Sequence, residues 1–192
     1  MKNLVFLLAF LLCVPCFAGA EKNMDINGSF EKCRANAKGF VTPEGWVMNK
    51  ISKGVKYSAT TEEVRSGKFS FYVEASEKAV AYIYYNTTNL KAAAGDDFIL
   101  TVYGKGEGKF NLGFTVYSDD AKPVFVRTIG GKPQKITDGE KWQKFVFTCP
   151  LRKLKRGGKE YTKFQLRPTL MISGAGEFVL DDLTCEKKGG KQ

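Results

Sequence analysis

Short runs of alternating apolar and polar residues follow one another along most of this chain, a pattern typical of β-strands. In residues 68–74, Phe69, Phe71 and Val73 fall on one face and Tyr72 falls on the other. We expect the first face to be buried. The same kind of run recurs at six further places: 98–103, 110–117, 124–129, 142–148, 164–171 and 178–183.

Turn-forming Gly, Pro, Asn and Asp residues separate these runs. Residues 104–108, which hold three glycines, are expected to form a loop between two strands, and Leu100 and Val102 to point into the core. Residues 89–94 could make one helical turn, and no sustained helical stripe occurs. The pattern predicts an all-β chain: an antiparallel β-sandwich or jelly roll in one domain.

The N-terminus reads as an export signal. Lys2 precedes an apolar run at 4–12, and Ala18-Gly19-Ala20 offers a peptidase site, so we expect a signal peptide over 1–20. The run is too short to cross a bilayer. A short N-terminal helix is the alternative. We therefore expect a secreted or periplasmic protein, with its sandwich over 21–186 and a disordered basic tail over 187–192.

The chain carries a formal net charge of +10. Such an excess favours solubility and attraction to anionic surfaces, but it does not identify a partner. Lysine and arginine are spread along the chain except for a denser stretch at 152–159, which we interpret as a solvated loop. We expect neither nucleic-acid binding nor insertion into a membrane after signal cleavage.

Three cysteines remain after the predicted cleavage: Cys33, Cys149 and Cys185. An exported protein can hold a disulfide, and an odd number leaves one thiol over. Cys33 and Cys185 could meet if the terminal strands are neighbours, and Cys149 could be a buried free thiol. The sequence leaves all three pairings open.

The composition argues against catalysis. The chain has no histidine, which removes the commonest general base, the usual nucleophile pairs and histidine metal sites. No phosphate-binding glycine motif occurs. A small glycoside hydrolase or lyase needs only two acids, and it stays a less favoured alternative. Adjacent acids occur at four places: Glu62-Glu63, Asp96-Asp97, Asp119-Asp120 and Asp181-Asp182.

Several short motifs in a fixed order carry a resemblance to a known group of proteins. They are Asn27-Gly28-Ser29-Phe30-Glu31, Pro43-Glu44-Gly45-Trp46, Ser66-Gly67-Lys68-Phe69-Ser70, Trp142-Gln143-Lys144-Phe145 and Phe178-Val179-Leu180-Asp181-Asp182-Leu183. Together, from about Asp25 to Thr184, they resemble the carbohydrate-binding modules of families four, nine and twenty-two. Those modules are galactose-binding-domain-like β-sandwiches.

The resemblance implies a structural calcium ion near the chain ends. The matching carboxylates are Glu31 and Asp181, and backbone carbonyls near Lys68 would complete the site. Calcium prefers six to eight oxygen ligands in flexible geometry, which residues from distant strands can supply. The alternative is that both acids pair with nearby lysine or arginine.

The resemblance also implies that Trp46 and Trp142 pack in the interior. Better sugar platforms are aromatics that oppose the core-facing set, because sugar rings need flat apolar faces with polar groups beside them. Tyr82 and Tyr84 share such a face, while Tyr85 lies with Ile83 on the other. The candidate ligand residues, expected to converge on the outer face of one sheet, are Tyr72, Glu74, Tyr82, Tyr84, Asn111, Tyr117 and Arg127.

The sequence thus favours non-catalytic binding of a polysaccharide or oligosaccharide by an exported module with a structural calcium. The basic balance favours an acidic polysaccharide without excluding a neutral glucan or xylan. The main alternative is an envelope structural or adhesion protein that binds another protein through the same sandwich.

Overall fold

The computed structural model describes residues 22–35, 40–87 and 90–188, and every regular element in these ranges is a β-strand. The predicted all-β class is confirmed. The predicted signal peptide and residues 189–192 of the predicted tail lie outside the described residues. The strands are β1 (Lys22–Asn23), β2 (Cys33–Ala35), β3 (Val41–Pro43), β4 (Trp46–Met48), β5 (Lys53–Thr60), β6 (Ser70–Tyr85), β7 (Leu90–Ala93), β8 (Asp97–Ser118), β9 (Phe125–Gly130), β10 (Gln134–Ile136), β11 (Gln143–Pro150), β12 (Leu154–Arg156), β13 (Lys159–Tyr161), β14 (Lys163–Ser173) and β15 (Gly176–Lys188).

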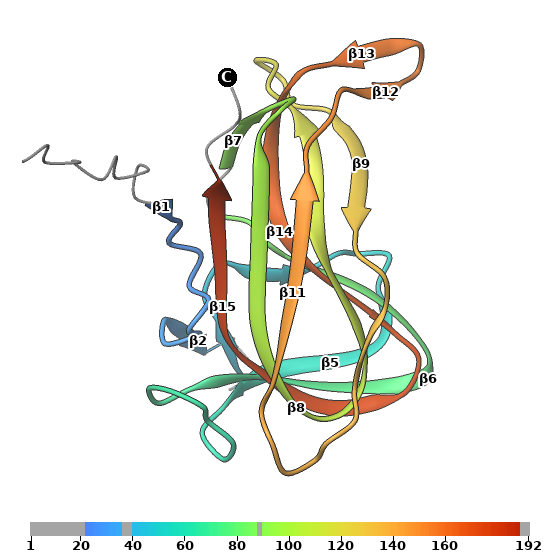
Figure 1. Ribbon diagram of the computed structural model, residues 1–192. Coiled ribbons are helices and arrows are strands. Elements are labelled where there is room, and N and C mark those ends of the chain that lie inside the picture. Colours follow the sequence, from blue (N-terminus) through green and yellow to red (C-terminus); the bar gives the residue numbers. More distant parts are fainter. Residues whose placement is uncertain (1–21, 36–39, 88–89, 189–192) are drawn as a thin grey trace, which may run out of the picture.

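Two long strands, β6 and β8, run through both layers of an antiparallel sandwich (Figure 1). Their first parts, 70–75 and 97–107, pair with β5, β11 and β15 to form what we call sheet I. Their second parts, 80–85 and 108–118, pair with β4, β9, β10 and β14 to form sheet II. The short β12–β13 hairpin projects at one end of the molecule (Figure 1).

The core fills the space between the two sheets with aromatic and branched side chains. The Phe110 ring of sheet II lies 5.1 Å from Phe145 and 6.0 Å from Phe178, both in sheet I. Trp46 and Phe71 meet across the same space at 6.2 Å. These ring contacts show that the inward faces of the two sheets are packed against each other.

The predicted core is confirmed at most of its positions. Phe71, Val73, Leu100 and Val102 are fully buried. Phe69 is only partly buried, because it precedes β6 and is not held in the sheet. The two tryptophans differ in burial. Trp46 is 2% exposed, as expected, whereas Trp142 lies before β11, is only partly buried and lies outside the core cluster.

The expected loop at 104–108 is wrong, because these residues lie inside the continuous strand β8. The glycines allow β8 and β15 to pack closely. A side chain at Gly108 would place its Cβ 2.5 Å from the Phe178 ring, and one at Gly106 would meet the Glu177 carbonyl oxygen at 2.5 Å. Gly106 also has a φ of 113°, which glycine adopts without strain. Residues 104–108 are therefore the part of β8 that passes from sheet I to sheet II, in close contact with β15.

Three other local expectations need correction. Residues 90–93 form the strand β7 and not a helical turn, because they pair with β14 at the sheet edge. The basic stretch 152–159 contributes to a hairpin, with Gly157 and Gly158 in its turn. Strand β15 extends through Lys188, so the first two residues of the predicted tail, 187 and 188, continue the sheet.

The three cysteines are free thiols. Cys149 and Cys185 are buried on strands that flank β8 on opposite sides, where they pair with Phe98 and Leu100. The strand between them keeps these two apart, and none of the three disulfide pairings left open by the sequence is formed. Within the described ranges, no helix is long and apolar enough to cross a membrane.

The close approach at Gly106 leads to a stability prediction. Gly106→Ala should lower the free energy of unfolding by about 2 kcal/mol or more, because the new methyl group meets backbone atoms and the φ is unfavourable. Gly139→Ala is the matched control, since nothing lies within 4 Å of its added Cβ. Urea unfolding monitored by tryptophan fluorescence measures both; equal midpoints would contradict the crossing described here.

Candidate functional site

The outer face of sheet II gathers aromatic and polar side chains in four cross-strand rows. Because directly paired residues of antiparallel strands point to the same side, the register defines these rows. We call this surface the Arg167 face. Its rows are Tyr82, Met171 and Asn111; Val47, Tyr84, Thr169, Gly113 and Gly130; Arg167, Thr115 and Thr128; and Gln165, Tyr117 and Phe125.

Arg167 lies between two tyrosine rings near the centre of this face. Its guanidinium carbon is 4.5 Å from the ring centroid of Tyr117 and 5.6 Å from that of Tyr84. Tyr117 in turn meets Phe125 edge-on, at 6.0 Å between centroids. Cation–π contacts of this kind hold the side chains in place and leave aromatic surface and N–H donors side by side.

The local sequence Arg167-Pro168-Thr169 explains how the arginine is held. Pro168 lies within β14, which is paired on both sides, although proline has no N–H to donate to a sheet. The hydroxyl of Thr169 accepts a 2.9 Å hydrogen bond from the Thr115 N–H and donates to the Arg167 carbonyl at 2.9 Å. The Thr115 hydroxyl lies 2.9 Å from the same oxygen.

Two glycines lower the surface next to this arginine. A Cβ at Gly113 or Gly130 would lie 2.7 or 2.3 Å from the Met171 methyl group, so the methionine occupies the space that their missing side chains leave. Asn111 donates to the Gly131 carbonyl at 3.1 Å. The face therefore has an apolar floor beside Arg167, with amide and hydroxyl groups along it.

The structure divides the predicted ligand residues between two surfaces. Tyr82, Tyr84, Asn111 and Tyr117 lie together on the Arg167 face. Tyr72 and Glu74 lie on the outer face of sheet I instead, because β6 has changed sheets between residues 75 and 80.

Arg127 also departs from the expected cluster. A bulge in the pairing of β8 with β9 places it opposite Val116, a core-facing residue, so it lies at the sheet edge and not in a row of the face.

Sequence reasoning missed the residue at the centre. The signal was present, because 164–171 alternates, and its outward positions are Gln165, Arg167, Thr169 and Met171. The pattern of 164–171 predicted a strand, but the outward polar residues of that strand were not considered as ligand candidates.

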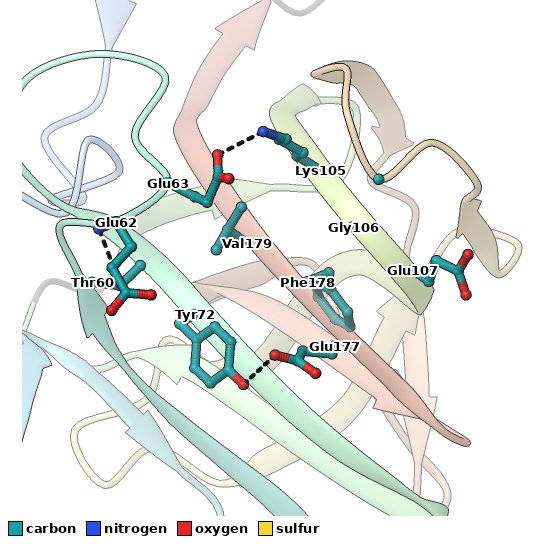
Figure 2. A pocket seen from close by; sticks show the side chains of 11 residues that line it. Thr60, Glu62, Glu63, Tyr72, Lys105, Gly106, Glu107, Glu177, Phe178 and Val179 are labelled. Carbon is teal, nitrogen blue, oxygen red and sulfur yellow. Dashed lines mark hydrogen bonds and ion pairs between the residues drawn. The ribbon is translucent and has the colours of Figure 1, made fainter.

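The outer face of sheet I contains a hollow of about 410 Å³ between β5, β6, β8 and β15 (Figure 2). The Tyr72 hydroxyl donates to Glu177 at 2.9 Å. Lys105 reaches Glu63 at 2.6 Å across the opposite side of the hollow (Figure 2). Burial, followed by the bond to Glu177, raises the pKa of Tyr72 to about 12, so its hydroxyl stays protonated at neutral pH.

Carboxylates dominate this second surface. Glu74, Glu177 and Glu107 stand directly opposite one another across β6, β15 and β8. Lys56 stands at the end of this row, directly opposite Glu74 and 2.9 Å from its carboxylate. Like charges in such a row repel one another. The outer face of sheet I therefore combines a row of acids with basic side chains, among them Lys56 and Lys105.

The two carboxylates expected at a calcium site both contact the loop at 65–69. The side chain of Glu31 accepts hydrogen bonds from the Lys68 and Phe69 N–H groups, each at 2.9 Å. Gly67, with a φ of 69°, leaves room for this carboxylate, because a Cβ there would lie 2.4 Å from its oxygen.

Asp181 holds the other side of the same loop and is fully buried. It accepts hydrogen bonds from the N–H groups of Arg65 at 2.9 Å, Ser66 at 3.1 Å and Asp182 at 2.7 Å. Burial raises the pKa of its carboxyl, and the bonds from Ser66, Asp182 and Arg65 act in the opposite direction.

These donors satisfy both acids without a lysine or arginine side chain. Across 22–35, 40–87 and 90–188, no three Asp, Glu, Cys or His side chains are close enough together to hold a metal. The Lys68 N–H is bonded to Glu31. A calcium ion bound between the two acids would therefore take its further oxygen ligands from the backbone carbonyls near Lys68.

Comparison with known proteins identifies the fold. No family model and no curated sequence matches the chain. Among solved structures, the xylan-binding CBM22-1 domain of Xyn10C from Paenibacillus barcinonensis superposes with a TM-score of 0.51 at 16% identity, over 78% of this chain and 90% of that one. TmCBM61, solved with β-1,4-galactotriose, gives 0.50 at 12% identity, over 87% and 99%.

The same fold also occurs in an enzyme. A Stig cyclase from Fischerella sp. TAU gives a TM-score of 0.58 at 13% identity, over 90% of this chain and 100% of that one. This chain therefore has the β-sandwich of carbohydrate-binding modules. Identities this low show the fold alone, and the function has to be argued from the surface.

The threonine pair that supports Arg167 provides a second prediction. Thr169→Val should cost about 1–3 kcal/mol of stability, because it leaves the buried Thr115 N–H without its acceptor. Thr128→Val, on the same face in β9, is the control and should change stability much less. Urea unfolding of both variants tests this; similar losses would show that the hydroxyl of Thr169 has no special role.

Proposed function

We propose that this protein binds a carbohydrate polymer non-catalytically on the Arg167 face. The observation that carries the proposal is the placement of Arg167 between Tyr84 and Tyr117 on the outer side of sheet II. Sugar rings present an apolar surface to aromatic rings and hydroxyls to neighbouring donors. On the Arg167 face, tyrosine rings are available for the apolar surface of the sugar, and Arg167 and Asn111 are available for its hydroxyls.

The fold supports this proposal, because modules that bind xylan and galactotriose share it. Catalysis is not part of the proposal. The rows of the Arg167 face contain no aspartate or glutamate, so the face offers no pair of acids for glycoside hydrolysis. Four glutamates line the hollow on sheet I, namely Glu62, Glu63, Glu107 and Glu177; Glu177 accepts from the Tyr72 hydroxyl and Glu63 is bound to Lys105.

We further propose that calcium binds between Glu31 and Asp181. Support comes from their convergence on one loop and from the burial of Asp181 with no cationic side chain bonded to it, since a cation would offset the cost of that charge. The carbonyls near Lys68 would be further ligands. Export through residues 1–20, to the periplasm or the medium, is also part of the proposal and rests on the sequence pattern alone.

The sugar proposal is tested by tyrosine truncation. Tyr84→Ala and Tyr117→Ala should each weaken binding of the best ligand from a polysaccharide panel by about tenfold, because each removes an aromatic platform. Tyr72→Ala, which removes the same ring from sheet I, is the control. Affinity gel electrophoresis measures the retardation.

Two results would count against this proposal. Loss in Tyr72→Ala with none in Tyr84→Ala would move the site to sheet I. A panel without any retarded polysaccharide, together with a captured envelope protein, would favour the adhesion alternative.

Calcium removal supplies a separate test. If the ion binds, a chelator should lower the melting temperature, and added calcium should restore it. Asp181→Asn should remove this response, while Asp120→Asn, an exposed acid beside Lys159, should keep it. A melting temperature that ignores both chelator and calcium would show that the backbone N–H groups alone hold the loop.

A further inference from the structure

The β12–β13 hairpin lies against the loop between β8 and β9 at one end of the sandwich (Figure 1). The directly paired residues Leu154 and Tyr161 pack on the core and anchor the hairpin. Lys159 reaches Asp120 of the loop at 3.3 Å, which joins the two segments. We call these segments the hairpin end; it comprises residues 119–127 and 152–163.

Positive charge predominates in the hairpin end, because the acids there are already bound to lysines. Asp119 is bound to Lys91, Asp120 to Lys159 and Glu160 to Lys153. Asp119 also accepts a hydrogen bond from Gln165 at 3.0 Å. The remaining basic side chains are exposed and form no ion pair with any acid of the described residues; they are Lys122, Arg127, Arg152, Lys155, Arg156 and Lys163.

Two exposed apolar residues stand beside these bases. Val124 is 44% exposed, and its neighbour Phe125 is 41% exposed. The backbone of Val124 is fixed by Ser118, whose N–H donates to its carbonyl at 2.9 Å and whose hydroxyl accepts from its N–H at 3.1 Å. The Arg156 guanidinium lies 5.1 Å from the Phe125 ring. Basic and apolar groups therefore occur together, in fixed positions, at this end of the molecule.

This combination fits the surface of an anionic lipid bilayer. Anionic headgroups attract lysine and arginine, and the boundary between headgroups and acyl chains accepts apolar and aromatic side chains. Long basic side chains keep their charges at the headgroups while a short apolar segment enters between them. A soluble polyanion would contact the bases alone and leave Val124 and Phe125 in water.

We propose that the hairpin end binds the surface of a bilayer that contains anionic phospholipids, without crossing it. Val124 and Phe125 enter the headgroup region, and the unpaired lysines and arginines contact headgroup phosphates. This inference does not depend on the proposed sugar binding. Phe125 lies in the last row of the Arg167 face, two rows from Tyr84, so the two surfaces adjoin but are distinct.

Co-sedimentation with vesicles tests the proposal. Residues 22–192 are used, since they include every described strand and the apolar run at 4–12 would bind lipid by itself. Vesicles of phosphatidylcholine are compared with vesicles that also contain phosphatidylglycerol. Binding should require phosphatidylglycerol and should fall as added salt screens the charges. Equal binding to both kinds of vesicle, or binding to neither, would overturn the proposal.

Charge variants locate the contact. Lys155→Gln and Arg156→Gln should each weaken binding to the anionic vesicles about fivefold, the effect of one basic residue near such a surface. Lys144→Gln, which removes an exposed lysine from β11 in sheet I, is the matched control and should change nothing. Melting curves show whether each variant is folded. If Arg156→Gln is not, Lys155→Gln decides, because Lys155 lies on the side of the hairpin opposite to Leu154 and Tyr161.

An apolar variant separates lipid from other anions. Phe125→Ser should weaken vesicle binding about tenfold, because a ring that leaves water on binding is lost. Ile51→Ser removes another exposed apolar side chain, which is 72% exposed in the turn after β4, and is the control. Full binding by Phe125→Ser, together with displacement from the vesicles by dextran sulfate, would identify a soluble polyanion as the partner and overturn the lipid proposal. Unchanged binding in all the hairpin variants would also overturn it. Each of these outcomes leaves the sugar proposal standing, since polysaccharides test that proposal separately.

Discussion

The fold depends on the close contact between β15 and the middle of β8. Phe178 packs where side chains at Gly106 and Gly108 would stand, and this contact lets β8 pass from one sheet to the other without a break. Since β8 takes part in both sheets, the crossing fixes how the two layers are stacked and which residues of the strand face outward in each. A bulkier residue at this point would separate the layers and remove the contact of Phe110 with Phe178 on which the core relies.

The alternation of apolar residues predicted the strands and most of the core, because a two-residue period assigns each side chain to one face of its strand. It correctly separated Tyr82 and Tyr84 from Ile83 and Tyr85. It could not tell which outward faces belong to the same sheet. Residues 70–85 form one strand, yet Tyr72 and Tyr84 lie on opposite sides of the molecule, because the strand pairs with β15 at its start and with β14 at its end. That information resides in long-range pairing and not in the local pattern.

The candidate site illustrates the same limit. Gly104 to Gly108 read as a loop because glycines mark turns more often than crossings, and packing against β15 overrides that local preference here. Arg167 was overlooked although 164–171 was predicted as a strand and its outward position follows from the two-residue period. The hydroxyl of Thr169 binds the Thr115 N–H, a contact between residues 54 positions apart. No local rule predicts such a contact.

The threonine pair also has a consequence for binding. Thr169 binds the Thr115 N–H, and the two hydroxyls lie 2.9 Å apart, so the pair links β14 to β8 on the outer side of the sheet. Because Thr169 also binds the Arg167 carbonyl, the backbone that carries the arginine is held by side chains of the face itself. The guanidinium is then confined between Tyr84 and Tyr117, so less side-chain entropy remains to be lost when a ligand binds there.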